Sequence, residues 1–331
     1  MYDAPTWGQM SNSVTIKVPA RLHLGFLDLS GEAVRRFGSL GLPLSEPEMV
    51  LTLSRAAETI VEGPDSARAA EHLATLSGHL GIRSHHRLSI EQAIPRHAGL
   101  GSGTQIAIAV AAALRTLHRL PLETGTDAIL LGRGERSGIG IASFESGGLI
   151  IDAGKDDSGK QPPVIARLPF PDDWRVLLIL DSHLNGIHGA DEIEAFRALP
   201  PFPTTSAGEI CRHVLMGVMP AMIEHNLAAF GTAITAIQST IGAYFAPAQG
   251  GVFTSKRVEA VANRLAEAGA VGIGQSSWGP TGFAFAPSQD AAEAMVRAAA
   301  GTAETGVEIK IVRGRNSGAE IAPSELDLVG S

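Results

Sequence analysis

Small residues meet a run of helix-forming residues in the stretch 94–117, IPRHAGLGSGTQIAIAVAAALRTL. Glycine tolerates positive φ and lets a ligand approach the main chain closely. The first N–H groups of a helix have no partner inside the helix and carry partial positive charge. Together these features predict a loop that binds phosphate, although a tight turn without a ligand would use the same residue types. The predicted loop consists of Gly99, Leu100, Gly101, Ser102, Gly103 and Thr104.

The residues at the two ends of this loop leave alternatives open. Either Ser102 or Thr104 is the expected N-cap of a helix over 105–117. His97 is either a ligand contact or a solvated loop residue, and Gln105 is either a ligand contact or a simple helix former. The loop is not a Walker A loop, which needs Gly-Lys-Ser/Thr, and it is not a Gly-x-Gly-x-x-Gly dinucleotide motif after an early strand.

A second group of reactive side chains lies in the segment 13–29, SVTIKVPARLHLGFLDL. Its alternating apolar residues predict a strand interrupted at Pro19, and the period of two places Arg21 and His23 on one face. Arg21 is suited to clamp a phosphate or carboxylate, and His23 to donate a hydrogen bond or move a proton. We therefore treat Arg21, His23 and Asp28 as catalytic candidates. The alternative is an Arg21–Asp28 ion pair beside an ordinary buried histidine.

Other candidate side chains are few. A helix expected over 126–136 ends at Arg133 and Arg136. A catalytic role for Arg136 competes there with simple stabilisation of the helix dipole. The single cysteine, Cys211, excludes a disulfide framework and is expected to lie in the core.

The elements that would position these groups favour an α+β fold. Strands come first in the N-terminal half, one of them at 49–56, and they are not regularly interleaved with helices. The Pro-rich segment 161–174, QPPVIARLPFPDDW, reads as a loop or linker. We expect two domains, 1–170 and 171–331, with the phosphate loop in the first.

Composition limits the class of protein. The 331 residues are 44% hydrophobic and 18% charged, which predicts a folded chain with a sizeable core. The net charge of −8 argues against a general nucleic-acid surface. No apolar run is long enough to span a membrane, and the first residues do not resemble a signal peptide, so we expect a cytoplasmic protein.

Three segments resemble the signature motifs of the GHMP kinase superfamily. They are KVPARLHLGFLDL, which is similar to its N-terminal motif, PRHAGLGSGTQ, similar to its second motif, and GQSSWGPTGFAF, similar to its C-terminal motif. The resemblance implies a GHMP-kinase-like two-domain fold, with an N-terminal domain like domain 2 of ribosomal protein S5 and a ferredoxin-like C-terminal domain. Against the glycine loop, we expect the cleft to be lined by Gln275, Ser276 and Ser277.

The resemblance also bears on the reaction. In mevalonate-kinase-like members the stretch Ser-Gly-Ile-Asp-Asn contains the catalytic base, and Gly140 stands here where that Asp would be. Glycine cannot accept a proton. Because some kinases of the superfamily also lack this Asp, an ATP-dependent small-molecule kinase stays an alternative. A catalytically inactive nucleotide-sensing protein is a further alternative.

Four segments together resemble the β-ribofuranosylaminobenzene 5′-phosphate synthase family of methanopterin biosynthesis. They are PARLHLGFLDL, HAGLGSGTQ, RSGIGIASFESGGLIIDAG and GIHGADEIEAF. This resemblance implies condensation of 4-aminobenzoate, or a related benzoate, with phosphoribosyl pyrophosphate (PRPP). Carbon dioxide and pyrophosphate would leave, and the phosphate loop would bind PRPP.

The same resemblance implies a metal, a substrate loop and an assembly. Mg²⁺ is the implied cofactor, and Glu145 is the candidate ligand for it. His188 and Glu192 lie in a segment similar to the family's Gly-x-x-Glu-x-x-x-Phe, for which we expect a substrate loop. A homodimer is the implied assembly.

Overall fold

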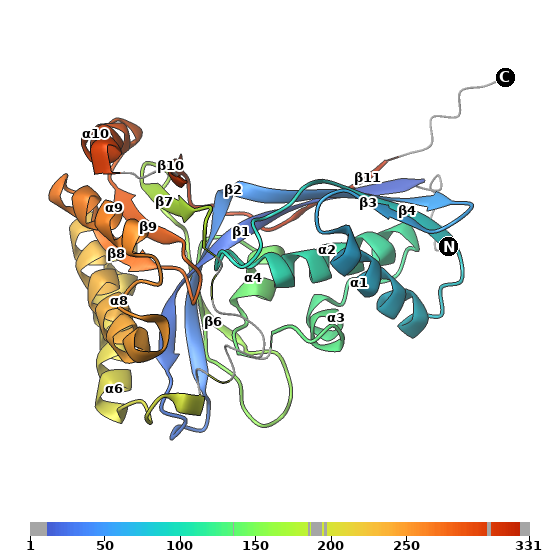
Figure 1. Ribbon diagram of the computed structural model, residues 1–331. Helices are drawn as coiled ribbons and strands as arrows, with labels where there is room; N and C mark the ends of the chain where they lie inside the picture. Colours follow the sequence, from blue (N-terminus) through green and yellow to red (C-terminus); the bar gives the residue numbers. More distant parts are fainter. Residues whose placement is uncertain are drawn as a thin grey trace, which may run out of the picture.

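A seven-stranded sheet forms the larger layer of the molecule within the part of the chain described (Figure 1). The computed structural model describes residues 12–134, 136–184, 186, 194, 197–302 and 306–324. The strands of this sheet are β1 (Ser13–Asp28), β2 (Phe37–Ala56), β3 (Ile60–Glu62), β4 (His85–Gln92), β5 (Leu149–Asp152), β6 (Val164–Leu168) and β11 (Glu320–Ser324). Their order is β11-β1-β2-β4-β3, with β5 paired to β2 and β6 to β5. The pairing is antiparallel except between β3 and β4.

Helices cover one face of this sheet (Figure 1). They are α1 (Ser66–His79), α2 (Ser102–Leu117), α3 (Thr124–Leu130) and α4 (Ile139–Glu145). The sequence of α2 is apolar on all sides, and its residues are buried almost throughout. Its many alanines let the sheet, α1 and α4 approach closely, so α2 is the central helix of this half.

A four-stranded antiparallel sheet forms the second half in the order β10-β7-β9-β8. Its strands are β7 (Arg175–Asp181), β8 (Val271–Gln275), β9 (Gly282–Ala286) and β10 (Val307–Val312). The remaining helical elements are α6 (Thr204–His213), η1 (Val214–Val218), α7 (Met219–Ile223), α8 (Leu227–Gln249), α9 (Lys256–Glu267), α10 (Gln289–Ala299) and η2 (Ala300–Thr302). Two sheets with separately placed helices make this the α+β fold that the sequence predicts.

The chain passes between the two sheets twice. It crosses first between β6 and β7, close to the predicted boundary at residues 170 and 171. It returns after β10, because β11 pairs with the start of β1 through Ile321 and Ile16. The last described strand therefore belongs to the first sheet, and the two domain ranges inferred from sequence remain predictions.

The first two strands are longer than the apolar pattern indicates. β1 is not interrupted at Pro19, because a register shift between Pro19 and Arg21 accommodates the residue that lacks an N–H. β2 begins at Phe37 instead of residue 49. Both strands extend beyond the α-helical layer toward the second half of the molecule (Figure 1), and this extension carries Arg21 and His23 to the junction.

The helix expected over 126–136 is shorter than predicted. α3 ends at Leu130, because Gly132 and Gly134 have φ of 67° and 79° and lead the chain out of the helix. Arg133 and Arg136 consequently lie in the loop before α4, where a stabilising contact with the helix terminus is no longer the explanation for them.

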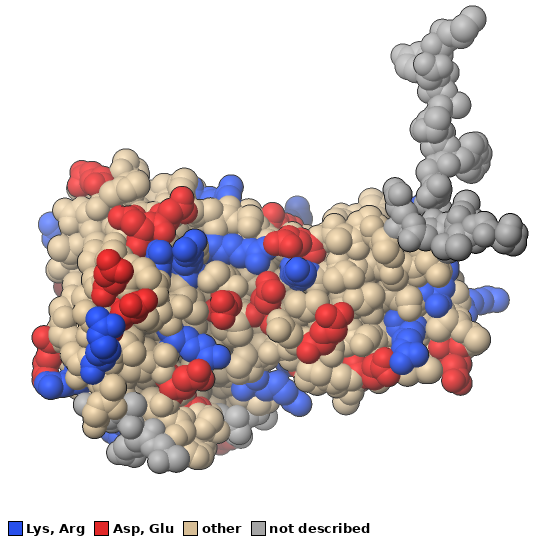
Figure 2. Space-filling model, turned by 90° about the horizontal axis from the view of Figure 1, so that it is seen from above, with Lys and Arg blue, Asp and Glu red and all other residues tan. Residues whose placement is uncertain are grey.

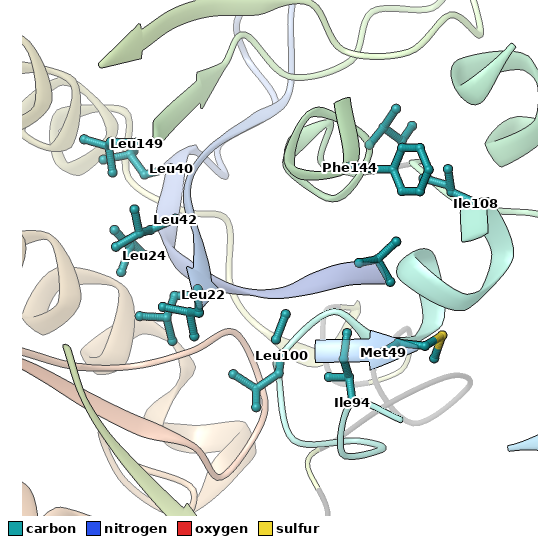
Figure 3. Close-up of a cluster of buried hydrophobic side chains, with 14 of the residues drawn as sticks. Leu22, Leu24, Leu40, Leu42, Met49, Ile94, Leu100, Ile108, Phe144 and Leu149 are labelled. Carbon is teal, nitrogen blue, oxygen red and sulfur yellow. The ribbon is translucent and has the colours of Figure 1, made fainter. Parts of the chain in front are cut away.

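The glycine loop rests on the largest apolar core. In Figure 3, Leu100 lies with Leu22 of β1 and Ile94, close to Met49 of β2, while Ile108 of α2 meets Phe144 of α4. All of these side chains are buried. The backbone of the loop is therefore supported from below by side chains that face away from any ligand.

The exposed surface carries charges of both signs. Figure 2 shows Lys and Arg side chains interspersed with Asp and Glu on the face it presents. Within the described ranges, no helix combines the length and apolar character that a transmembrane span needs.

Candidate functional site

The glycine loop joins β4 to α2 through a backbone that only certain residues adopt. Gly99 and Gly101 have φ of 79° and 83°, and His97 has φ of 55°. Left-handed backbone is costly for residues with a Cβ, so the two glycines explain how the loop turns within so few residues.

Gly101 is the N-cap of α2, so the expected capping by Ser102 or Thr104 is wrong. The Gly101 carbonyl accepts the N–H groups of Thr104 and Gln105, each at 3.1 Å. The N–H groups of Ser102 and Gly103 precede these and have no partner inside the helix. They lie at the positive end of the helix dipole, at the wall of a cavity that both residues line.

Two glycines bring this loop against the loop between β8 and β9. A Cβ on Gly99 would lie 2.1 Å from the Ser276 carbonyl oxygen, and one on Gly279 would lie 2.3 Å from the Ala98 carbonyl. The buried Ser276 hydroxyl accepts the His23 N–H at 2.9 Å and donates to the Gly99 carbonyl at 2.8 Å. One hydroxyl therefore links β1, the glycine loop and the β8–β9 loop.

A cavity of about 450 Å³ opens over the glycine loop, and we call it the glycine-loop cavity. Four arginines line it from four separate segments, whereas no carboxylate does so among the described residues. These arginines are Arg21 of β1, Arg68 of α1, Arg96 before the loop and Arg133 between α3 and α4. The other lining residues are His97, Gly99, Gly101, Ser102, Gly103, Thr104, Ser277, Trp278 and Gly279.

Arg21 is fixed against the glycine loop by its main chain and its side chain. Its N–H donates to the Leu100 carbonyl at 3.1 Å, and its Nη1 donates to the Gly99 carbonyl at 3.2 Å. Burial lowers the pKa of Arg21 to about 10, so it stays protonated at neutral pH. Its Nε is buried and has no hydrogen-bond partner within the described part of the chain.

Asp65, a buried carboxylate behind the cavity, holds two of the other arginines. It hydrogen-bonds Arg68 and lies 3.7 Å from Arg96, and its side chain is 2% exposed. It precedes α1 with φ of 64°, an unusual backbone for a residue with a side chain. Burial, followed by the charges of Arg133 and Arg68, lowers the pKa of His72 nearby to about 4, so this histidine is neutral.

His23 faces a different space, which we call the His23 crevice. This crevice measures only about 20 Å³, and Phe26 and Phe245 line it with His23. The His23 ring lies 4.4 Å from that of Phe26, and its buried Nε2 has no partner among the residues described. Burial, and next the charge of Arg21, lowers the pKa of His23 to about 3. Ser277 lines both the crevice and the glycine-loop cavity.

The other predicted serine-loop residues support the site from outside the cavity. The Gln275 side chain accepts the Thr254 N–H at 2.6 Å and donates to the Ser277 carbonyl at 3.0 Å. Gln275 also lines the His23 crevice. Of the predicted trio, only Ser277 lines the glycine-loop cavity, while Ser276 acts through the bridge to Gly99.

Leu100 and Gln105, both predicted at the phosphate site, point into the protein. Leu100 is a core residue, and only its carbonyl serves the site, by accepting from Arg21. The fully buried Gln105 side chain donates to the Gly140 carbonyl at 2.9 Å, which ties α2 to α4.

Three predicted residues lie away from the cavity walls. Asp28 accepts the Ser30 N–H and hydroxyl at the end of β1, and no ion pair between Arg21 and Asp28 occurs in the described structure. Arg136 lies between α3 and α4 and is not among the described lining residues. Glu145 is exposed at the far end of α4, where it accepts a hydrogen bond from Thr124.

The donor set around the cavity does not match a metal held by the protein. Mg²⁺ prefers oxygen ligands and is usually bound through one or two carboxylates. Among the described residues, no group of three or more His, Cys, Asp or Glu side chains could hold a metal ion. Asp65, which lies behind the cavity, is already committed to Arg68 and Arg96.

Gly140, which the resemblance places at the position of the kinase base, is packed against Thr104. A Cβ on Gly140 would lie 2.8 Å from Thr104 Cγ2, and the Gly140 carbonyl already accepts from Gln105. An aspartate at this position would need Thr104 to move. The structure therefore agrees with the absence of an acid that the sequence shows.

The predicted substrate-loop residues His188 and Glu192 lie outside the described residues. Gly186, just before them, is described, and its N–H donates to the His97 carbonyl at 2.8 Å. A Cβ there would lie 2.5 Å from the Trp278 carbonyl oxygen. Gly186 thus lies directly beside the glycine loop.

Sequence reasoning missed three arginines of the cavity, because it selected Arg136 in place of Arg133 and did not consider Arg68 or Arg96. Arg68 belongs to α1 and Arg96 stands three residues before Gly99. The position of Arg96 beside His97 was a usable signal, because a basic residue next to a phosphate loop favours anion binding. Nothing in the local sequence of α1 indicates that Arg68 would face the same cavity.

Comparison with family models covers both halves of the chain. The model of the GHMP kinases N terminal domain matches residues 60–148, and the model of the GHMP kinases C terminal domain matches residues 218–304. The first range contains the glycine loop and the second contains the β8–β9 loop. The two segments that meet at Gly99 and Ser276 therefore belong to the two matched domains.

Three archaeal proteins, each described as a β-ribofuranosylphenol 5′-phosphate synthase, are similar over most of their length. The protein of Methanothermobacter thermautotrophicus is 32% identical over 80% of this chain and 86% of its own. That of Archaeoglobus fulgidus is 34% identical over 67% and 74%, respectively. That of Methanocaldococcus jannaschii is 32% identical over 67% and 76%.

Solved structures extend the likeness to the whole fold. A homoserine kinase from Cytophaga hutchinsonii has a TM-score of 0.70 at 18% identity, covering 96% of this chain and all of its own. A mevalonate diphosphate decarboxylase from Staphylococcus aureus has a TM-score of 0.65 at 14% identity, covering 95% and 98%. With the family models, these structures confirm the predicted GHMP-kinase-like fold.

Proposed function

The chain belongs to the GHMP kinase superfamily and, within it, to the β-ribofuranosylphenol 5′-phosphate synthase family, and on this premise we propose that it is a C-riboside synthase. It condenses PRPP with a 4-substituted benzoate and releases pyrophosphate and carbon dioxide. The product is a ribofuranosylarene 5′-phosphate, as in the methanopterin pathway that the resemblance implies.

The observation that carries this proposal is the cavity with four arginines and no carboxylate among the described residues that line it. Pyrophosphate carries several negative charges, and guanidinium groups bind phosphoryl oxygens in a planar, bidentate manner. The free N–H groups at the start of α2 add donors that cannot lose a proton. Arg21, Arg68 and the N–H groups of Ser102 and Gly103 are the groups we assign to the pyrophosphate.

The bonds change in three steps. The bond between C1 of the ribose and the pyrophosphate oxygen breaks, and the electron pair leaves with pyrophosphate. The ring carbon that bears the carboxylate then forms a bond to C1 of the oxocarbenium-like ribose. The bond to the carboxylate breaks last, and its electron pair restores the aromatic ring as carbon dioxide leaves. The arginines stabilise the charge that develops on the departing pyrophosphate.

The aromatic acceptor belongs on the other side of Ser277. Phe26 and Phe245 offer apolar ring faces there, and His23 is a neutral hydrogen-bonding group. At about 20 Å³ the crevice holds roughly one water molecule, so the acceptor requires it to widen. An apolar environment also favours decarboxylation, because it solvates the carboxylate poorly.

The acceptor is best assigned as 4-hydroxybenzoate. The sequence leaves amino and hydroxy forms open, and the resemblance that it shows suggests 4-aminobenzoate first. The three relatives are named for a phenol product, and a phenol requires a hydroxyl opposite the carboxylate that leaves. Transfer of that name to this chain favours the hydroxy acid.

The Mg²⁺ implied by the family resemblance remains a prediction. Glu145, its candidate ligand, lies at the far end of α4 beside Thr124, outside the cavity. The described residues thus do not form a carboxylate site for the metal, and no step above depends on one. The cytoplasmic location and the homodimer also remain predictions.

A direct assay tests the synthase reaction. The chain is incubated with PRPP and either 4-hydroxybenzoate or 4-aminobenzoate labelled in the carboxyl carbon, and released carbon dioxide and pyrophosphate are measured. We expect release of both from the hydroxy acid in equal amounts, and much less from the same assay with Arg21→Ala. Tight PRPP binding without carbon dioxide from either acid would contradict the proposal.

The kinase alternative is disfavoured by Gly140, where a side chain would meet Thr104. An inactive nucleotide-sensing protein would bind ATP in preference to PRPP. Thermal unfolding in the presence of each compound separates these cases, because a ligand that binds the folded state raises the midpoint. We expect a larger shift with PRPP, and a larger shift with ATP would favour the alternatives.

A further inference from the structure

A second basic cavity adjoins the glycine-loop cavity. It measures about 290 Å³, and its walls come from the start of β2, the end of α3 and the loop between β5 and β6. We call it the lysine cavity. Its lining residues are Arg36, Ile129, Arg133, Gly134, Lys155, Asp156, Asp157, Gly159 and Lys160.

The charges of the lysine cavity do not cancel. Its two acids are already paired, Asp156 with Arg35 at 2.8 Å and Asp157 with Arg36 at 2.7 Å. Within the described part of the chain, no carboxylate lies in ion-pair distance of Lys155 or Lys160. The two ammonium groups thus leave the cavity positively charged, in a protein whose net charge is negative.

The wall that carries the lysines is anchored to the sheet. Lys155 and Arg36 exchange main-chain hydrogen bonds of 2.9 and 3.0 Å. Gly154, just before Lys155, donates its N–H to the buried Asp152 carboxylate at 2.8 Å, and a Cβ on Gly154 would collide with the Arg36 carbonyl. The lysine cavity is therefore part of the folded layer and not an open loop on the surface.

Arg133 lines both cavities. On one side its Nη1 lies 3.1 Å from the position of a Cβ on Gly103, at the first turn of α2. On the other side, its neighbour Gly134 forms a wall with Lys155 and Lys160. The two cavities therefore share Arg133 as a wall.

We propose that the lysine cavity binds the 5-phosphate of PRPP while the glycine-loop cavity binds its pyrophosphate. This inference rests on the synthase function proposed above, because PRPP carries two anionic groups on opposite ends of one ribose. Two adjoining basic cavities of unequal size match such a substrate. The larger cavity, with its four arginines, suits the pyrophosphate, and the smaller one, with two lysines, suits the monophosphate.

This arrangement fixes the direction of the ribose. With one end held at Lys155 and Lys160 and the other at the glycine loop, the ribose and its C1 lie beside Arg133, the residue that lines both cavities. The His23 crevice opens beside Ser277, which also lines the glycine-loop cavity. The place assigned to the aromatic ring thus adjoins the cavity that binds the pyrophosphate.

Calorimetric titration with ribose 5-phosphate and with pyrophosphate, each alone, tests the two cavities without turnover. In the double variant Lys155→Ala/Lys160→Ala we expect ribose 5-phosphate to bind about tenfold more weakly or worse, with pyrophosphate affinity unchanged within about twofold. Arg133→Ala is expected to weaken both ligands. Lys17→Ala, which removes an exposed lysine of β1, is the control for loss of one charge and should change neither.

Each outcome decides one question. Unchanged ribose 5-phosphate affinity in the double variant would overturn the proposal, and so would an equal loss of both ligands. Steady-state kinetics then separates the subsite from the reaction. Carbon dioxide release with an unaltered KM for PRPP in the double variant would overturn the subsite and leave the synthase function standing. Binding as expected without any carbon dioxide would retain the subsite and overturn the synthase function.

Discussion

The glycine-loop cavity and the His23 crevice share Ser277 yet offer opposite environments. The cavity is open and lined by four arginines and by main-chain N–H groups. The crevice is narrow and lined by aromatic rings, amides and a histidine that burial keeps neutral. A phosphoryl group and an aromatic ring need these two environments, so the contrast assigns each substrate to one side of Ser277.

β1 supplies one key side chain to each space. Arg21 lines the cavity and His23 the crevice, although only Leu22 separates them. Register shifts in the pairing of β1 with β2 occur on both sides of these residues, one between Pro19 and Arg21 and one after His23. Substitutions that alter only the glycine-loop cavity or only the His23 crevice therefore test whether the two bind their substrates independently.

The largest expected effect comes from Gly99→Ala, because Gly99 bears on both spaces. Its φ of 79° costs an alanine about 1–3 kcal/mol, and the new Cβ would lie 2.1 Å from the Ser276 carbonyl oxygen. We expect turnover to fall by at least about 100-fold with a lower thermal midpoint. Gly78→Ala at an exposed position of α1, where a Cβ meets nothing within 4 Å, is the matched control. Normal turnover in Gly99→Ala would remove the loop from the site.

Arg21→Ala should separate the two spaces. Loss of one preorganised donor to a developing anion costs on the order of 100-fold in rate. We expect kcat/KM for PRPP to fall by about this factor, with the KM for the benzoate altered by less than about threefold. The measurement is initial velocity against each substrate in turn. An equal loss for both substrates would show that the cavity and the crevice act as one site.

Asp65→Asn should produce a smaller effect limited to the cavity. The carboxylate holds Arg68 and Arg96 without lining the cavity itself, so its loss leaves the arginines present but less well oriented. We expect the KM for PRPP to rise about tenfold while kcat changes little. In an Arg96→Ala background the same substitution should have a weaker effect. Full additivity of the two changes would exclude a positioning role through Arg96.

Three buried histidines are expected to make the stability of the fold depend on pH. The folded pKa of His23 is about 3, and those of His72 and His86 are about 4, all below the ordinary value of 6.5. The unfolded chain therefore takes up protons first as the pH falls below about 6.5, and stability present above that pH is lost toward pH 4. Asp152, whose pKa burial raises to about 6, opposes this trend in the same window.

Urea unfolding at pH 5 and pH 7 measures the balance. Three histidines against one acid predict a lower free energy of unfolding at pH 5, by an amount on the order of 1 kcal/mol per histidine. His86 lies on β4, away from the cavity, so His86→Gln should flatten the dependence without altering PRPP binding. Equal stability at the two pH values would contradict burial of neutral histidines.

The smallest expected effect is that of Cys211→Ser. The sequence suggests a core cysteine, but Cys211 is exposed on α6, and its Sγ lies 3.9 Å from the Leu27 carbonyl. We expect the free energy of unfolding to change by less than about 0.5 kcal/mol and both KM values to stay the same. A clear loss of activity would mean that α6 contributes to the crevice side of the site.

The segments of the site that are continuous in sequence could be predicted from the sequence. The residues that tertiary packing brings to the site from other segments could not. The glycine loop, its helix and the strand with Arg21 depend on short-range patterns of turn residues and apolar period. Arg68 enters the cavity only because α1 packs beside α2, which no local pattern states. Gln105 and Glu145 were predicted to bind ligands because their side chains are chemically suited to it. In the structure, Gln105 instead hydrogen-bonds the Gly140 carbonyl and Glu145 accepts from Thr124, and local sequence does not indicate either contact.

The pairing of β11 with β1 has a consequence for the order in which the molecule assembles. The strand that completes one side of the larger sheet is made after every other described element, since it spans residues 320–324. During synthesis the edge of β1 therefore stays open while the second half of the chain emerges and folds. A nascent chain in that state exposes an unpaired strand to its neighbours, so β11 protects the edge of β1 from pairing with another chain.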